Sequence, residues 1–311
     1  PKKANDYNIL SSLRADEIQL GQVWAHSLSF MQPEFQVLQL PFIFQSYTHV
    51  HNVLAGPLGE GLLSLIEPYG YKGLAFPTGP GGYKIIGSPE KNHYLTTPED
   101  FEGLRYYANK GSTNRGLMEL LNTNLVPGDR ITDQGIRVTR PQAYQQEDPI
   151  NYVEGSFAQI ENEVLLELGS PNSFTLSYHN YETSVLLMQK DAFEALPKGY
   201  QDILTQAAKE AAAYDRDMAQ YYGQVRKQLL KRRRYYIQEW PKKAENTFRK
   251  AVVPLYEQVL SSSSARDLAA AIKAAGRGLP ENRGPGEPTE EVNALVEDIS
   301  TVLNELQGLD W

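Results

Sequence analysis

One long apolar pattern in the second half of the chain constrains the fold more than any other feature. After Pro197, apolar residues recur every three or four positions as far as Arg234. They are Ile203, Ala207, Ala211, Tyr214, Met218, Tyr222, Val225 and Leu229. This period predicts an α-helix, which would be on the order of 55 Å long if it were continuous. A single small domain does not need such a helix, so we expect it to lie along two lobes or to bend between them.

The composition agrees with two lobes and excludes several classes of protein. The chain has 311 residues, enough for two domains of roughly 100–200 residues each. Its 41% hydrophobic residues can fill real cores, but no apolar run approaches the ~18–20 residues of a membrane span. A net charge of −8 disfavours nucleic-acid binding, and the basic residues 231–234 are explained as the positive complement of a helix C-terminus.

The absence of Cys excludes disulfides, thiolate metal sites and cysteine nucleophiles. It leaves the compartment open, because proteins without disulfides occur on both sides of a membrane. The segment PKKANDYNIL at the start has no leader pattern, so we expect any export signal to have been removed or never to have existed.

Short apolar segments alternate with helical patterns in the first half of the chain. Strands or strand ends are expected at residues 22–28, 37–44, 73–77, 84–87 and 104–108. A helix is expected within residues 47–65, and Thr97 followed by Pro98 is typical of a helix start. This alternation predicts an α/β fold.

The remaining segments predict further elements and several loops. Residues 184–188 and 235–240 are expected to be strands and residues 245–260 a helix, whereas 261–264 and 276–288 are predicted linkers. Residues 122–149 lose the hydrophobic period and predict a long, partly irregular loop of functional importance.

The motifs that carry catalytic or metal chemistry are weak. His49 and His51 are two residues apart, and on a helix such side chains point away from each other, so no metal site is expected. Residues 79–82 predict a turn rather than a phosphate loop, and no nucleophile motif is visible. We therefore expect neither an enzyme nor a cofactor; an active site would require His26 and Glu161 to meet in the cleft.

Several strings follow one another in a specific order. They are QVWAHSLSFMQPEF at 22–35, VLQLPFIF at 37–44, KGLAF at 72–76, TTPEDFEGLR at 96–105 and a long string at 175–219. The chain resembles the DctP-type solute-binding subunits of tripartite ATP-independent periplasmic (TRAP) transporters. The resemblance implies a two-lobed α/β binding protein in the periplasm, with the long helix spanning both lobes. Such a protein closes on a small polar, anionic organic solute and delivers it to a membrane permease.

The resemblance also implies a division of the chain. Lobe I comprises residues 1–105 and 188–234, lobe II comprises 106–187 and 235–260, and 261–311 form a linker and a helical tail. Only about twenty residues precede the QVWAHSL string, where the family has a strand, a helix and a second strand, so an exposed sheet edge is expected.

The expected ligand site departs from the family pattern. Tyr107 stands where the family usually places an arginine that grips the ligand carboxylate, and Arg105, Lys84, Lys110, Arg137 or Arg140 could replace it. The complete set of expected ligand-binding residues is Trp24, His26, Tyr83, Lys84, Arg105, Tyr107, Asn109, Arg140, Gln159 and Asn162. The alternative is a family member with a degenerate cleft that acts as an interaction module and pairs through the sheet edge or the C-terminal segment, as a homo-oligomer.

Overall fold

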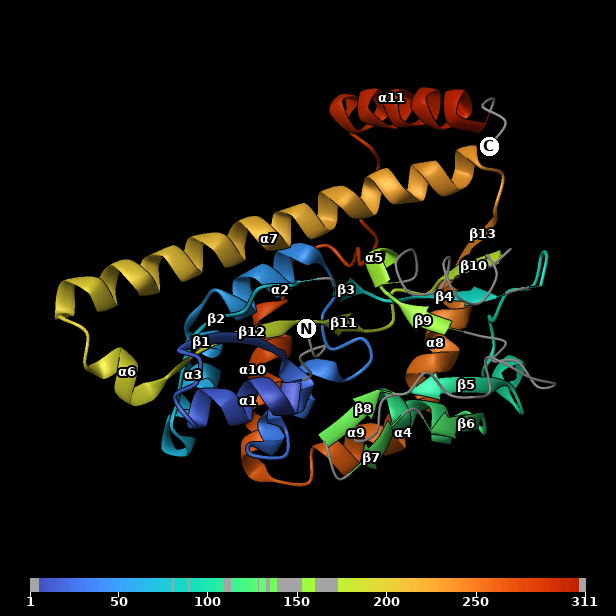
Figure 1. Cartoon of the computed structure of the whole chain (residues 1–311). Helices are drawn as coiled ribbons and strands as arrows, with labels where there is room; N and C mark the ends of the chain where they lie inside the picture. The colour runs from blue at the N-terminus through green and yellow to red at the C-terminus, as the bar shows by residue number, and fades with distance from the viewer. Residues whose placement is uncertain are drawn as a thin grey trace.

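Two β-sheets lie side by side beneath one long helix (Figure 1). The computed structural model describes residues 6–79, 81–88, 90–108, 113–127, 129–132, 135–138, 153–159 and 173–307. The long helix is α7 (Lys198–Arg232), whose 35 residues extend about 52 Å and pass over both sheets. The predicted helix is therefore confirmed. Within the described ranges, none of the helices combines the length and the apolar character that crossing a membrane would require.

The first sheet has the strand order β1-β12-β2, and both pairings are antiparallel. Its strands are β1 (Leu20–Trp24), β12 (Ser184–Gln189) and β2 (Tyr71–Ala75). The helices α1 (Asp6–Arg14), α3 (Pro57–Ser64) and α6 (Lys190–Glu194) pack around it. In the described part of this sheet β1 is an edge strand, and Leu20 at its start is half exposed.

The second sheet has the order β13-β10-β4-β9, in which only the β13–β10 pairing is parallel. Its strands are β13 (Tyr236–Glu239), β10 (Ser173–Leu176), β4 (Ile85–Ser88) and β9 (Val153–Gly155). Nearby lie α4 (Thr113–Leu120), α8 (Lys242–Ala251), α9 (Val253–Val259) and two small sheets. The small sheets are β5 (Arg105–Ala108) with β6 (Asn124–Pro127), and β7 (Asp129–Thr132) with β8 (Gly135–Val138).

Two chain segments cross between the sheets side by side. The chain leaves the first sheet after β2, passes through β3 (Gly82–Tyr83) and enters the second sheet at β4. It leaves the second sheet after β10, passes through β11 (Tyr181–Glu182) and returns to the first sheet at β12. Because β3 and β11 pair with each other, the crossing is a two-stranded ladder. Any relative motion of the two sheets must bend this ladder.

Residues 37–44 are not a strand, so that prediction was wrong. The 3₁₀-helix η2 (Pro33–Gln39) occupies the first part, and the chain continues irregularly through Pro41 to Phe44. Leu38, Leu40 and Phe44 are nevertheless buried. A short apolar run shows that a segment is buried but does not distinguish a strand from another buried conformation.

Two other expected elements are interrupted at predictable residues. The helix expected within 47–65 is divided into α2 (Tyr47–Leu54) and α3 at Gly56 and Pro57, because proline has no N–H to continue the ladder. The strand expected at 22–28 ends at Trp24, where the 3₁₀-helix η1 (Ala25–Leu28) begins. Thr97 precedes the 3₁₀-helix η4 (Pro98–Phe101), as expected for a helix start.

In the C-terminal part, the serine run at 261–264 is a helix start rather than a linker. The hydroxyl of Ser262 accepts the N–H of Ala265 and caps α10 (Ser263–Ala275). Residues 276–288 contain no helix or strand, as predicted, and they lead to α11 (Glu290–Gln307), which packs on α7.

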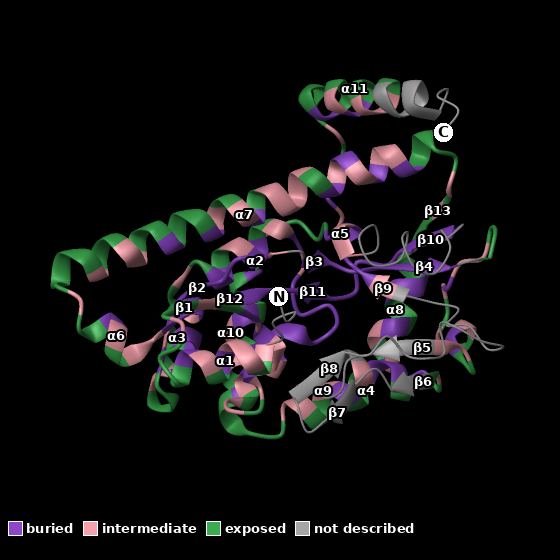
Figure 2. Cartoon of the chain, in the orientation of Figure 1, coloured by how far each residue is buried: buried purple, intermediate pink, exposed green. Residues whose placement is uncertain are grey.

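The apolar side chains whose spacing predicted α7 do not all face the core. Ala208 and Ala212 of α7 pack on Leu74, Ala75 and Met188 of the first sheet. Ile203 and Tyr214, which belong to the predicting pattern, are exposed. Figure 2 shows exposed residues along α7. The helix was predicted correctly, but its sheet-facing side is built mainly from small residues.

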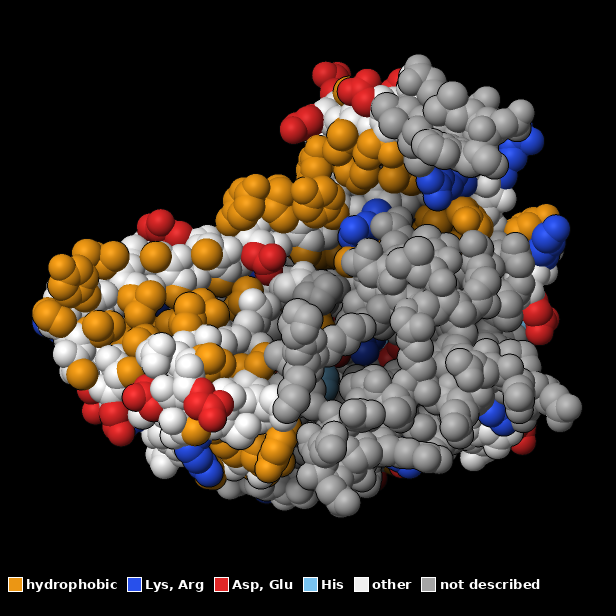
Figure 3. Space-filling view, viewed as in Figure 1, with side chains coloured by type: hydrophobic (Ala, Val, Ile, Leu, Met, Phe, Trp, Pro, Cys, Tyr) orange, Lys and Arg blue, Asp and Glu red, His pale blue; other side chains and the backbone are white. Residues whose placement is uncertain are grey.

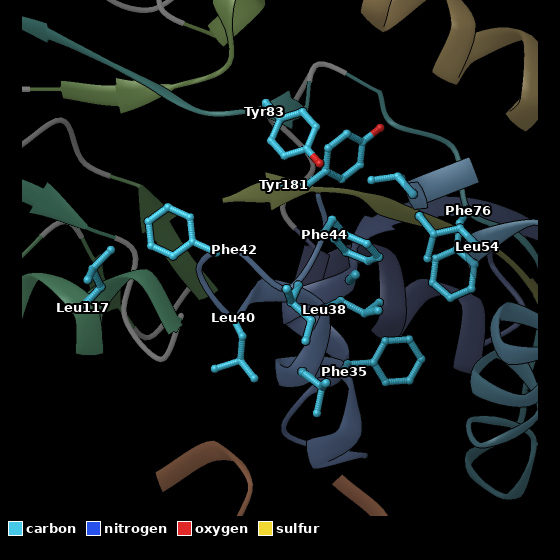
Figure 4. Close-up of a cluster of buried hydrophobic side chains, with 14 of the residues drawn as sticks. Phe35, Leu38, Leu40, Phe42, Phe44, Leu54, Phe76, Tyr83, Leu117 and Tyr181 are labelled. Carbon is cyan, nitrogen blue, oxygen red and sulfur yellow. The ribbon is translucent and has the colours of Figure 1, made fainter. Parts of the chain in front are cut away.

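One large hydrophobic cluster connects the two halves of the molecule. Figure 4 shows Phe35, Leu38 and Phe44 on the segment before α2, with Tyr83 and Tyr181 of the crossing strands close to one another. The same cluster reaches Leu117 in α4. The crossing strands are thus anchored in the core, and they hold the polar residues that follow them in fixed positions.

Candidate functional site

A cluster of buried polar side chains lies where the crossing strands meet. Tyr83 pairs with Tyr181, and Gly82 pairs with Glu182. Gly81 permits this close approach, because a Cβ at this position would lie 2.3 Å from the backbone oxygen of Glu182. Gly82 has a φ of +113°, which other residues rarely adopt. Glycine at these two positions therefore sets the path of the ladder.

A buried lysine lies between two buried carboxylates at the end of this ladder. Nζ of Lys84 is 3.2 Å from Oε1 of Glu154 and 3.8 Å from Oε1 of Glu182. All three side chains are about nine-tenths buried or more. Burial by itself would lower the pKa of Lys84, but the charges of Glu182 and Glu154 outweigh it and raise the pKa. Lys84 is therefore charged at neutral pH.

Two histidines extend the cluster on either side. Nε2 of His179 is 3.1 Å from Oε2 of Glu154, and its Nδ1 is 2.7 Å from the hydroxyl of Ser177. Nδ1 of His26 is 3.6 Å from Oε1 of Glu182 and has no hydrogen-bond partner among the described residues. Burial lowers the pKa of His26, although the charge of Glu182 opposes this effect. His26 is therefore neutral at neutral pH.

Gln159 fixes the second oxygen of Glu182. Its amide nitrogen donates to Oε2 of Glu182 at 2.9 Å, and its amide oxygen accepts the N–H of Ser156 at 2.7 Å. The ring of Trp24 stacks on that of His26, with 6.4 Å between the centroids. The seven side chains of this site come from β1, η1, the crossing segments, β9 and α5 (Phe157–Gln159), and they converge from distant parts of the chain.

An aromatic cluster supports the site from the other side of the ladder. The rings of Tyr47, Tyr83 and Tyr181 meet edge to face, with centroids 5.0 to 6.1 Å apart. Burial raises the pKa of all three, and that of Tyr181 rises to about 12. Their hydroxyls therefore stay protonated, and that of Tyr181 lies 2.9 Å from the hydroxyl of Thr78.

Figure 3 shows a hollow in the face of the molecule, in which atoms of basic, acidic and histidine side chains are visible. The described polar groups near the ladder can bind a solute through hydrogen bonds and charge. Carboxylates accept from hydroxyl or ammonium groups, whereas Lys84 and Gln159 donate. Three or more His, Cys, Asp or Glu side chains arranged to hold a metal ion are not found in the described part of the chain.

The structure brings together part of the expected ligand-binding set. Trp24, His26, Lys84 and Gln159 belong to the polar cluster, and Tyr83 belongs to the aromatic cluster. Arg105 and Tyr107 lie on β5, which pairs with β6 outside the two main sheets. Asn109, Arg140 and Asn162 lie outside the described residues, as does Lys110, and Arg137 lies on β8.

Three members of the cluster were not expected from the sequence: Glu154, His179 and Glu182. Glu182 could have been found from the sequence, because it is an acidic residue two positions before the buried strand expected at 184–188. Both ring nitrogens of His179 lie within hydrogen-bond distance of a neighbour, Ser177 and Glu154. Glu161, the expected partner of His26 in an active site, lies outside the described residues.

The His49–His51 pair has a structural explanation. Nε2 of His49 lies 2.7 Å from the backbone oxygen of Ile272 in α10, and Nδ1 accepts the N–H of Gln45 at 3.3 Å. Nε2 of His49 thus joins α2 to α10, and Nδ1 binds the backbone just before α2.

Comparisons with known proteins identify the family of this chain. The family model described as bacterial extracellular solute-binding protein, family 7 (DctP) matches residues 2–127 and 170–263. The C4-dicarboxylate-binding periplasmic protein DctP of Rhodobacter capsulatus is 28% identical over 70% of this chain and 62% of its own length. The 2,3-diketo-L-gulonate-binding periplasmic protein YiaO of Escherichia coli is 24% identical over 69% of this chain and 61% of its own length. The chain thus spans about three fifths of these relatives.

The solved structures show the same fold. A TRAP periplasmic solute-binding protein of Haemophilus influenzae with bound L-gulonate superposes with a TM-score of 0.75, at 22% identity, over 88% of this chain and 85% of that one. The two-lobed α/β fold with a long helix is therefore confirmed. Because the family model covers most of the chain, the chain belongs to the bacterial extracellular solute-binding proteins of family 7.

Proposed function

We propose that this protein is a periplasmic solute-binding protein that captures a small polar organic acid between two lobes and delivers it to a TRAP-type membrane permease. Export to the periplasm is part of the proposal. Family membership and relatives named for binding a keto-sugar acid or C4-dicarboxylates support this role over that of an interaction module with a degenerate cleft. The observation that carries the proposal is the buried Lys84–Glu154–Glu182 cluster at the strands that cross between the sheets.

The charge balance of the cluster narrows the chemistry of the solute. Burial lowers the pKa of His26, and beside this neutral ring the cluster holds two carboxylates, Glu154 and Glu182, against the one ammonium of Lys84. An acid without other polar groups gains little from such a surface, because its own charge would be repelled. Hydroxyl groups, in contrast, donate well to buried carboxylates. The proposed solute is therefore a hydroxylated organic acid, such as a sugar acid.

The carboxylate of that solute needs a cation. Arg140 and Arg105 are the proposed partners, with Tyr107, Asn109 and Asn162 as further hydrogen-bonding residues. Arginine is the preferred side chain for this task because its planar fork binds a carboxylate with two parallel hydrogen bonds. Tyr107 can supply only one neutral hydrogen bond in its place.

The two sheets are the proposed cores of the two lobes. The division into 1–105 with 188–234 and 106–187 with 235–260 stays a prediction, and it places β4 in lobe I although this strand pairs within the second sheet. Closure would bend the β3–β11 ladder and bring the surfaces on either side of it onto the solute. Binding and release involve no chemical step on the solute.

The test is a thermal-shift screen followed by calorimetry with galacturonate, gulonate, succinate and glutamate. A sugar acid is expected to raise the melting temperature and to bind at least tenfold more tightly than succinate. Glu182→Gln should weaken sugar-acid binding, whereas Lys198→Ala, at an exposed helical ion pair, should not. Absence of stabilisation by any of the four acids would contradict the capture of such acids. Tighter binding of succinate would overturn the proposed solute class alone.

A further inference from the structure

A second pocket lies between α2 and α7, on the face of the β3–β11 ladder opposite the Lys84–Glu154–Glu182 cluster. Its volume is about 150 Å³, which has room for several water molecules or one small solute. Tyr181 of β11 lines it. Because side chains alternate along a strand, the next residue, Glu182, points to the opposite face of the ladder. None of the described lining residues belongs to the candidate solute site.

Arg216 of α7 lines this pocket and is almost completely buried, with an exposed fraction of 5%. Its Nη1 donates to the backbone oxygen of Phe76 at 2.5 Å, and its Nε has no hydrogen-bond partner among the described residues. The neighbouring carboxylate, Asp215, is used elsewhere, because its Oδ2 accepts the N–H groups of Thr78 and Gly79. Burial lowers the pKa of Arg216, but an arginine stays charged at neutral pH.

Arg216 differs in its partners from the other buried cations of the described chain. Each of those cations pairs with a carboxylate: Lys84 with Glu154, Lys227 with Glu239 and Arg283 with Glu245. Arg216 makes no ion pair with a described carboxylate. A buried charge without a counter-ion is costly, so a ligand that supplies an anionic group at this pocket would be favoured. A carboxylate fits best, because it can take two parallel hydrogen bonds from a guanidinium.

The other polar lining residues favour a ligand that carries both signs of charge. Asp217 follows Arg216 on α7 and lines the same pocket at an exposed position. A simple anion would be attracted by Arg216 but repelled by Asp217. An amino acid has its carboxylate and its ammonium group on one carbon atom, so it can use both charges. Thr48, His51 and Gln220 supply further hydrogen-bonding groups in the lining.

We propose that the pocket between α2 and α7 is a second ligand site, which binds a small amino acid. Arg216 binds the carboxylate of the amino acid, and Asp217 faces its ammonium group. The volume of the pocket suits a short side chain, such as that of alanine or serine. The site is separate from the candidate solute site, and the proposal does not depend on the proposed function.

The first test is isothermal titration calorimetry of the full chain with alanine, propionate and ethylamine. Propionate is alanine without its ammonium group, and ethylamine is alanine without its carboxylate. Alanine is expected to bind at one site, at least threefold more tightly than propionate and at least tenfold more tightly than ethylamine. Absence of alanine binding up to tens of millimolar overturns the proposed site. Propionate binding as tight as that of alanine overturns the assignment to an amino acid.

The second test locates the bound alanine with variants of the lining. Arg216→Gln should weaken alanine binding at least tenfold, but Arg216 is buried and its replacement also affects the fold. Thr48→Trp avoids this difficulty, because Thr48 is exposed and the larger ring fills the pocket without removing a buried group. It should weaken alanine binding at least tenfold at an unchanged melting temperature. Thr247→Trp, at an exposed position of α8, is the matched control and should bind alanine normally. Alanine binding insensitive to Thr48→Trp overturns the proposal.

Asp217→Asn separates a role in ligand binding from a role in the fold. Removing the carboxylate should weaken alanine binding about threefold, the size expected for an exposed charge pair, and should strengthen propionate binding. A change in the fold would instead alter both affinities in the same direction. An equal loss for alanine and propionate therefore contradicts the proposed contact between Asp217 and the ammonium group.

Discussion

The ammonium nitrogen of Lys84 lies 3.2 Å from a carboxylate oxygen of Glu154, which follows it 70 residues later in the chain. Lys84 comes from the segment that crosses between the two sheets, and Glu154 comes from β9, at the edge of the second sheet. The pair, with Glu182 beside it, joins the crossing strands to the second sheet by charge where the backbone ladder ends. Such a group is costly to desolvate, and buried charged clusters of this kind are typical of functional sites.

Lys84→Met is expected to lower the free energy of unfolding by about 3–5 kcal/mol, because it leaves two buried carboxylates without their cation. Urea denaturation followed by circular dichroism measures the change. The double variant Lys84→Met with Glu182→Gln should recover part of the loss. Lys198→Met, at the exposed Lys198–Asp202 pair, should change stability by less than about 1 kcal/mol. If Lys84→Met and Lys198→Met lowered the free energy of unfolding equally, the ion pairs of Lys84 with the two carboxylates would not stabilise the fold more than an exposed pair does.

Stability is expected to fall as the pH drops below about 6.5. Burial lowers the pKa of His26 and His49 from the ordinary value of 6.5, so the unfolded chain binds protons that the folded chain does not. The lost stability should appear between pH 6.5 and the lower pKa values of the folded protein. His26→Gln should make the dependence of melting temperature on pH shallower in this range. An unchanged slope in that variant would mean that His26 takes up its proton equally well in both states.

Arg283→Met is expected to destabilise the protein by about 3–5 kcal/mol, because it breaks a buried ion pair. Nη2 of Arg283 lies 2.6 Å from Oε2 of Glu245, and its guanidinium lies over the ring of Phe42, 5.3 Å from the centroid. This pair fastens the segment 276–288 to α8. Chemical denaturation gives the free energy, and limited proteolysis should show earlier cleavage within 276–288. Arg277→Met, at an exposed residue of the same segment, is the control.

A second pH-dependent loss is expected below about pH 4.5 from the same region. The hydrogen bond from Lys242 is the main cause that lowers the pKa of Glu281 to about 2, and the hydrogen bond from Arg283 and the charge of Arg249 add to it. The folded state therefore favours the ionised carboxylate, and its contribution is lost as the pH falls from 4.5 towards 2. Glu281→Gln should remove part of this acid sensitivity, measured as melting temperature against pH, and should leave the loss near pH 6 unchanged.

Gly81→Ala is expected to disturb the site as well as the fold. The added Cβ would lie 2.3 Å from the backbone oxygen of Glu182 and 2.9 Å from that of Thr78, so the crossing strands must move apart. A loss of about 1–3 kcal/mol and weaker solute binding are expected. Gly61→Ala, in α3 with nothing within 4 Å of its added Cβ, should be neutral or slightly stabilising. Full solute affinity in Gly81→Ala would show that the ladder tolerates displacement without effect on the site.

Local sequence patterns predicted the helices and strands that depend on the spacing of apolar residues or on capping residues. The period from Ile203 to Leu229 specifies a helix, Thr97 with Pro98 specifies a helix start, and short apolar runs gave β2, β4, β12 and β13. Family strings added the two-lobed fold, because their order and spacing reflect the whole chain. The apolar run at 37–44 was wrongly predicted to be a strand. It is buried on several sides, so it lacks the alternation of apolar and polar residues that identifies a strand.

Only the tertiary structure decided which residues meet. His26, Lys84, Glu154 and Glu182 are far apart in sequence, and they converge because the chain crosses twice between the sheets at a ladder that Gly81 and Gly82 permit. Tertiary structure also decided which side of α7 faces the first sheet: Ala208 and Ala212 pack there, and the stripe from Tyr200 to Tyr214 faces outward. A sequence period fixes the conformation of a helix, but the direction of its faces depends on what the rest of the chain brings against it.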